Sequence, residues 1–85
     1  MTTAFPRITI VAHRDGKPLN ICSVLEAAEC LLLNWPIHDG VKLKVASQKC
    51  LDALDGKATI SECRSAFIEA AKEARVLLDY PTTRA

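Results

Sequence analysis

The sequence is poor in the residues that usually build catalytic loops and ligand sites. It contains three glycines and two histidines, and aromatic residues make up 5% of its 85 positions. The glycines stand far apart, at positions 16, 40 and 56, so the chain has neither a phosphate-binding glycine loop nor a G-x-S-x-G nucleophile turn. These shortages argue against nucleotide-binding and hydrolase-type sites.

Long apolar segments are missing as well. No apolar run approaches the ~20 residues that are needed to cross a bilayer. The first residues, Met1 to Arg7, lack the basic-then-apolar layout of a secretory signal. The charge is nearly balanced, at 11 basic against 10 acidic residues, so no overall field attracts nucleic acid or anionic lipid. We therefore expect a cytoplasmic protein with no membrane segment.

The size of the chain limits its organisation. Eighty-five residues, 49% of them hydrophobic, can fill one core but not two. Because aromatics are scarce, that core must consist of Leu, Ile, Val, Ala and Cys. We expect a single domain over residues 1–85, ordered from about 7 to 78, with frayed ends at 1–6 and 81–85.

Four cysteines, Cys22, Cys30, Cys50 and Cys63, are widely spaced and form no C-x-x-C pair. Without a secretion signal, they are expected to be reduced thiols rather than a disulfide framework. Structural zinc usually takes closely spaced ligand pairs, so we expect no metal. Free cysteine is among the most buried residue types, and the four are predicted to pack as small hydrophobes.

The first part of the chain predicts a β-hairpin. Apolar residues alternate on both sides of Asp15-Gly16, a dipeptide that is typical of two-residue type I′ turns. Pro18 cannot donate to a ladder, so its strand should lie at an edge. The turn would set these pairs opposite one another: Arg14 with Lys17, His13 with Pro18, Ala12 with Leu19, and Ile10 with Ile21.

A first helix should begin at the capping box Ser23 to Glu26 and end at Trp35-Pro36, because the residue before proline is disfavoured in the α region. Helical spacing predicts that one side of it faces the core. That side comprises Val24, Leu25, Ala28, Leu31, Leu32 and Trp35. Trp35 is thus interpreted as a core anchor rather than the wall of a pocket.

Two further helices follow. One covers about Val41 to Asp55 and should end at Gly56 in a left-handed conformation. The next opens with the capping box Thr59 to Glu62 and continues to about Arg75. Their predicted inner residues are Leu43, Ala46, Cys50, Ala53 and Leu54 in the first, and Ile60, Cys63, Phe67, Ala70, Ala71 and Ala74 in the second. The fold class is therefore α+β, an N-terminal β-hairpin followed by three short helices (ββααα), with Val76 to Leu78 either ending the last helix or forming a short third strand.

A family resemblance covers about residues 8 to 78. It rests on the order and spacing of Trp35-Pro36, Gly40, Ala46, Cys50-Leu51, Ala53-Leu54, Gly56, Ala66-Phe67, Ala70-Ala71 and Ala74. This pattern resembles the short bacterial proteins of the domain of unknown function 982 family, in which a glycine often stands where this chain has Arg75. The resemblance implies a bacterial, cytosolic protein and no particular activity.

Self-association or binding to another protein is the function that we expect. Cys30 and Leu33 should project away from the inner side of the first helix, and Ile68 away from that of the third. A chain this small also gains from burying more surface in a complex. We therefore predict an interaction surface at Cys30, Leu33 and Ile68, serving a homodimer or a protein partner.

Nucleic-acid binding is the alternative, through Arg14 and Lys17 at the hairpin tip with Lys42 and Lys49 on the second helix. Neighbouring acidic residues interrupt these cations, and no aromatics are spare for stacking on bases. An enzyme comes last, since its best nucleophile pair, Cys22 with His13, is kept apart by the predicted register. We therefore expect no catalytic residue and no bound cofactor.

Overall fold

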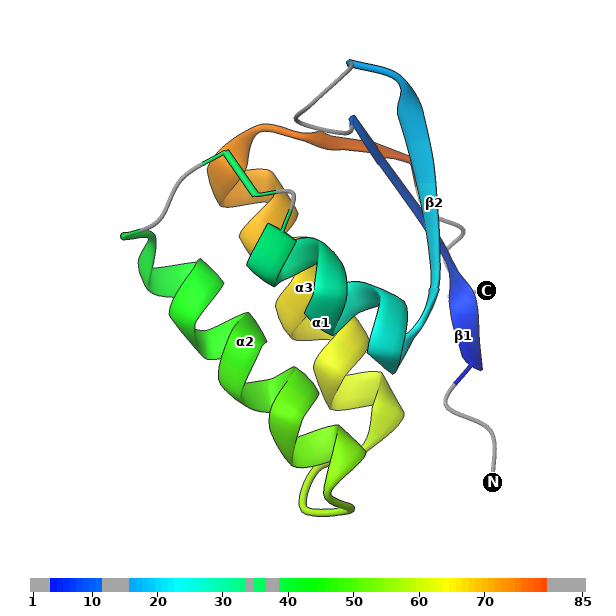
Figure 1. Cartoon of the computed structure of the whole chain (residues 1–85), viewed down its shortest axis with the longest axis vertical. Helices are drawn as coiled ribbons and strands as arrows, with labels where there is room; N and C mark the ends of the chain where they lie inside the picture. The colour runs from blue at the N-terminus through cyan, green and yellow to red at the C-terminus, as the bar shows by residue number, and fades with distance from the viewer. Residues whose placement is uncertain (1–3, 12–15, 34, 37–38, 80–85) are drawn as a thin grey trace, which may run out of the picture.

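The computed structural model describes residues 4–11, 16–33, 35–36 and 39–79. Three strands and three helices follow one another along these residues (Figure 1). They are β1 (Ala4–Val11), β2 (Pro18–Ser23), α1 (Val24–Leu33), α2 (Val41–Leu54), α3 (Ile60–Ala74) and β3 (Leu77–Asp79). The α+β class and the order ββααα are confirmed, and the segment after the last helix forms the third strand.

The three strands make one antiparallel sheet in the order β2-β1-β3. The helices α1 and α3 pack against this sheet, and α2 lies on their far side (Figure 1). The core fills the space between these layers, with Ile8, Ile21 and Phe67 among its most buried side chains. One continuous apolar cluster therefore joins the sheet to all three helices.

The hairpin register differs from the prediction by two residues. Ile8 lies opposite Ile21 and Ile10 opposite Leu19, so the predicted pairs Ile10 with Ile21 and Ala12 with Leu19 are wrong. A shift of two residues leaves every side chain on the same face of the sheet, so the alternating pattern cannot distinguish the two registers. The tertiary structure decides between them, and it pairs Ile8 with Ile21 and Ile10 with Leu19.

The edge position of Pro18 is confirmed, since β2 is an outer strand. Its neighbour across the ladder is Val11, not His13 as predicted. The expected pair of Arg14 with Lys17 lies outside the described residues.

The ordered part of the chain begins earlier than predicted. β1 starts at Ala4, and Phe5 is buried in the core, so residues 4–6 are not frayed. The Arg64 Nε–H of α3 donates to the Pro6 carbonyl at 3.0 Å. Burial of an aromatic side chain together with this bond explains why the strand extends toward the N-terminus.

The cap of α1 is confirmed with one difference. Ser23 Oγ accepts the Glu26 amide at 3.2 Å, and Glu26 Oε1 accepts the amide of Cys22 at 2.7 Å. The carboxylate thus reaches one residue further back than in the usual capping box. It ties the end of β2 to the start of α1 without an intervening loop.

The buried side of α1 is rotated from the predicted one. Its buried residues are Val24, Ala27, Cys30 and Leu31, whereas Leu25 and Leu32 are 53% and 80% exposed. The inward placement of Leu25 and Leu32 was therefore wrong. Since residues 30–33 are all apolar, periodicity could not choose which of them faces the core.

The other predicted inner residues are placed as follows. Leu43, Ala46 and Cys50 are buried on α2, and Ala53 is half-buried. Leu54, in the last turn, is 42% exposed, so its inward placement was wrong. On α3, Cys63, Phe67, Ala70 and Ala71 are buried as predicted, with Ile60 and Ala74 half-buried.

Both α2 and α3 end in Schellman motifs, in which a left-handed residue redirects the chain. After α2, Gly56 has a φ of 79° and the Lys57 amide bonds the Asp52 carbonyl at 2.7 Å. After α3, the left-handed residue is Arg75 (φ 60°), and the Val76 amide bonds the Ala71 carbonyl at 3.0 Å.

The turn at Arg75 creates the third strand. The Val76 carbonyl accepts the Val11 amide at 2.8 Å, and Leu77 then pairs with Ile10. The chain therefore leaves α3 directly into the sheet.

The start of α2 is capped by another helix. Gly40 provides no capping side chain, and the Glu73 carboxylate of α3 instead accepts the amides of Lys42 at 3.1 Å and Leu43 at 3.3 Å. A carboxylate here also faces the positive end of the α2 dipole. This contact holds the beginning of α2 against the end of α3.

Replacing Arg75 with glycine should raise the free energy of unfolding by about 0.5–1 kcal/mol, because glycine adopts a left-handed conformation without steric cost. The matched control is Gly56→Ala. A Cβ at Gly56 meets no atom within 4 Å, so that change should lower stability by about 1 kcal/mol through the backbone alone. Urea unfolding measures both, and a destabilised Arg75→Gly variant would contradict the left-handed turn.

Replacing Glu73 with alanine should lower stability by about 0.5–2 kcal/mol, because two helix amides lose their acceptor. Glu69→Ala is the control, since that exposed carboxylate on the same helix forms a surface ion pair with Lys72 at 3.3 Å, and its loss should cost at most about 0.5 kcal/mol. Equal losses in thermal unfolding would show that Glu73 is no cap.

Candidate interaction surface

An open apolar groove of about 440 Å³ runs between α1 and α2. Eight residues, spaced at helical intervals on the two helices, line it. They are Ala28, Leu31, Leu32, Leu43, Lys44, Ser47, Gln48 and Leu51. Their lining is mainly apolar, which is typical of contact surfaces.

The groove has a buried floor and exposed rims. Leu31 and Leu43 form the floor as members of the core. On the rims stand Leu32 on α1 and Leu51 on α2, which are 80% and 53% exposed. The small side chain of Ala28, between rim and floor, leaves the space open.

The described lining of the groove contains three polar residues, Lys44, Ser47 and Gln48. Among the residues that the structure describes, the groove lining includes no carboxylate, thiol or imidazole. Gln48 donates through Nε2 to Asp52 Oδ1 at 2.9 Å. Lys44 is the charged residue among the described lining residues, and its long stem can cover apolar surface while the ammonium stays in water.

A second, shallower hollow of about 290 Å³ lies between β2 and α1. It is lined by Leu19, Asn20, Ile21, Glu26, Glu29, Cys30 and Leu33. Burial raises the pKa of Cys30 to about 11, so this thiol stays protonated at neutral pH and is a poor nucleophile.

The structure places only one of the three predicted interaction residues at the surface. Leu33 is 67% exposed, but Cys30 and Ile68 are buried, so their outward orientation was wrong. Ile68 is covered because α3 has neighbours on two sides, the sheet and α2. Leu32 and Leu51 were missed as groove residues in the sequence analysis. They could have been found because α1 and α2 each carry more leucines than one buried stripe of a helix can hold.

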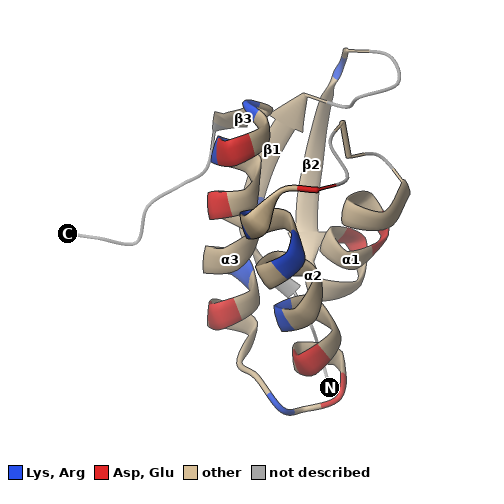
Figure 2. Cartoon of the chain, turned by 90° about the vertical axis from the view of Figure 1, so that its left-hand side faces the viewer, with Lys and Arg blue, Asp and Glu red and all other residues tan. Residues whose placement is uncertain are grey.

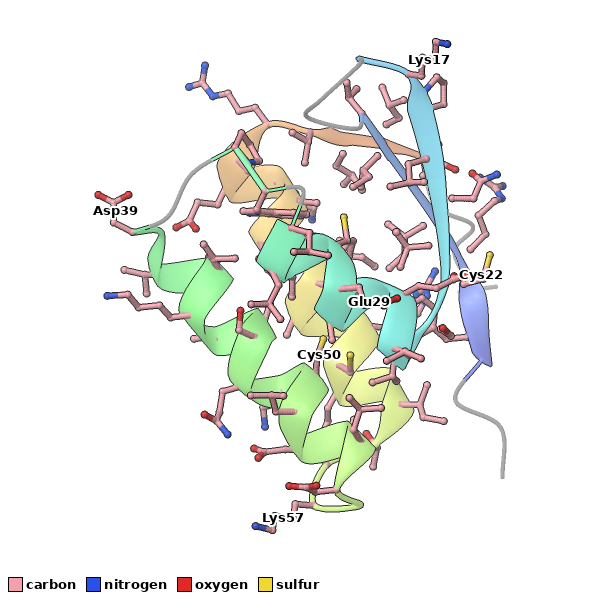
Figure 3. All side chains as sticks on the ribbon, viewed as in Figure 1. Lys17, Cys22, Glu29, Asp39, Cys50 and Lys57 are labelled. Atoms are coloured by element: carbon pink, nitrogen blue, oxygen red, sulfur yellow. The ribbon has the colours of Figure 1, made fainter. Side chains whose placement is uncertain are left out.

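The structure describes three of the four predicted nucleic-acid residues. Arg14 lies outside the described residues. Lys17 is exposed at the start of β2, whereas Lys42 and the half-buried Lys49 lie on α2. Figure 2 shows acidic and basic residues mixed over α2 and α3, and Figure 3 shows Lys17 and Lys57 at opposite ends of the molecule. In the view of Figure 2, acidic residues on α2 and α3 interrupt the basic ones.

The cysteines largely follow the prediction. Cys30, Cys50 and Cys63 are buried, whereas Cys22 is exposed on β2, so its predicted burial was wrong. The partner expected for Cys22 in an enzyme, His13, lies outside the described residues. Among residues 4–11, 16–33, 35–36 and 39–79, no group of three or more metal-ligating side chains is placed to hold an ion.

Trp35 is the core anchor that the sequence predicted. It is buried, and its ring meets that of Phe67 edge-on at 5.3 Å between centroids. Its indole N–H finds no acceptor within the described part of the chain. The side chain therefore contributes packing, while its buried donor detracts from stability.

None of the helices described is long and apolar enough to cross a membrane.

The fold and surface define a small α+β domain with an exposed apolar groove. Residues 8–78 match the family model described as "Protein of unknown function (DUF982)". The chain belongs to this family. No match was found among the curated proteins, and none among the solved structures.

Replacing Trp35 with phenylalanine should cost at most about 1 kcal/mol of stability, because the loss of apolar area is offset by removal of a buried donor without an acceptor. Trp35→Ala, which also removes the ring contact with Phe67, should cost about 3–5 kcal/mol. Urea unfolding followed by circular dichroism distinguishes them. Equal losses of stability in the two variants would mean that the indole N–H makes a stabilising hydrogen bond.

Proposed function

We propose that this domain is a non-catalytic interaction module that self-associates through the groove between α1 and α2. One observation carries the proposal: Leu32 is 80% exposed at the rim of a groove with an apolar floor. A leucine in that position costs free energy in water, and covering it recovers about 25 cal/mol per Å² of apolar area.

A second copy of the chain suits this surface. A two-fold interface uses the same patch on both subunits, so the patch must carry both a projection and a hollow. This one does, because Leu32 and Leu51 project while the space over Ala28 is open. Two such grooves facing each other would form a layer of four helices, with each Leu32 entering the groove opposite.

The size of the domain also supports self-association. The core that the described residues form, with 18 buried hydrophobic side chains, leaves little stability to spare in so short a chain, and an interface adds buried area. We place the protein in the cytoplasm because its four cysteines are free, as expected in a reducing compartment. The bacterial setting rests on the family resemblance alone.

The oligomeric state tests the proposal. Sedimentation velocity over a concentration series should show a reversible dimer of the full chain, and Leu32→Glu should weaken it at least about 100-fold, because a charge would be buried in an apolar interface. Leu51→Glu should act in the same direction.

Leu33→Glu is the matched control. Leu33 neighbours Leu32 and is also well exposed, but it lines the hollow on the β2 side instead of the groove. It should leave the dimer intact. A monomer at millimolar concentration, or equal effects of Leu32→Glu and Leu33→Glu, would refute self-association through the groove.

A further inference from the structure

Two buried cysteine thiols meet between α2 and α3. The Sγ atoms of Cys50 and Cys63 lie 2.9 Å apart, and neither residue is exposed to solvent. Figure 3 shows Cys50 between the ribbons of these two helices. A disulfide has an S–S length of about 2.05 Å, so the sulfurs need to approach by only about 0.9 Å to form one.

The pair is separate from the other cysteines. Cys22 is exposed on the edge strand β2, and Cys30 lies on α1. Within the described ranges, no third metal-ligating side chain joins Cys50 and Cys63. The chemistry available to the two thiols is therefore that of a dithiol rather than of a metal site.

The two thiols have different environments. Cys63 lies in the first turns of α3, where the positive end of the helix dipole favours a thiolate, while Cys50 lies near the opposite, negative end of α2. The hydrogen bond between the two thiols lowers the pKa of Cys63. The same bond, together with burial, raises the pKa of Cys50. Cys63 is thus the thiol that loses its proton more readily.

We propose that Cys50 and Cys63 form a redox site, which a two-electron oxidant such as a hydroperoxide converts into an intramolecular disulfide between α2 and α3. The Cys63 thiolate attacks the peroxide, the O–O bond breaks, and Cys63 becomes a sulfenic acid as hydroxide or alkoxide leaves. The Cys50 sulfur then attacks the Cys63 sulfur, and its proton leaves with the hydroxyl as water. Two thiols are oxidised and one peroxide is reduced.

The position of the pair determines what the bond does. It closes a loop across 13 positions of the sequence and links α2 to α3 covalently. Because both sulfurs are buried, an oxidant reaches them only when the helices open locally. Oxidation is therefore slow compared with that of an exposed thiol, and the product is more rigid. This inference does not depend on the proposed self-association.

Mass spectrometry of the full-length Cys22→Ser protein tests the site, because that substitution removes the exposed thiol that would cross-link chains. After incubation with hydrogen peroxide under native conditions, the intact mass should fall by about 2 Da and peptide mapping should join Cys50 to Cys63. The Tm should rise by roughly 10 °C or more, because the cross-link restricts the unfolded chain, and dithiothreitol should reverse both changes.

Cys30→Ala is the matched control and should leave the disulfide in place. Cys50→Ala should abolish the rise in Tm and leave Cys63 as a sulfenic or sulfinic acid. The proposal is overturned if Cys50 and Cys63 of the Cys22→Ser protein are still alkylated as free thiols after peroxide treatment and unfolding. It is equally overturned if the disulfide that forms joins Cys30 to either of them.

Discussion

The position of α3 between the sheet and α2 is the constraint on which the rest of the structure depends. Phe67 and Cys63 are completely buried there, and Ala70 and Ala71 let neighbouring backbones approach closely. Three contacts outside the core also start from this helix. Arg64 holds β1 through the Pro6 carbonyl, Glu73 caps α2, and the turn at Arg75 leads into β3. A change in the tilt of α3 would disturb the sheet and the other helices together.

The same layering explains why leucines remain exposed. α3 is covered on two sides, but α1 and α2 pack at the margin of the core, and the groove between them is left open. A domain of this size has too little interior to bury every apolar side chain. The leucines at the groove are thus a consequence of the architecture, and exposed apolar patches in general often mark contact sites for other chains.

The helix α2 contributes both to the groove and to the thiol pair. Leu43, Ala46 and Cys50 point inward, and Cys50 meets Cys63 of α3. Lys44, Gln48 and Leu51 follow at the next helical positions and line the groove. Since helix residues three and four apart share a face, one short helix can present a thiol to its buried neighbour and a contact surface to solvent.

Local signals in the sequence determined the order of elements, both capping boxes, the glycine turn after α2 and the anchoring role of Trp35, because each depends on residues close together in the chain. Only the tertiary structure decided the hairpin register, the buried side of α1 and the burial of Ile68. Registers two residues apart present the same faces, and a run of apolar residues fits the core in several rotations. The contact between Cys50 and Cys63 also required the fold, because only the packing of α2 on α3 brings together thiols that are 13 positions apart.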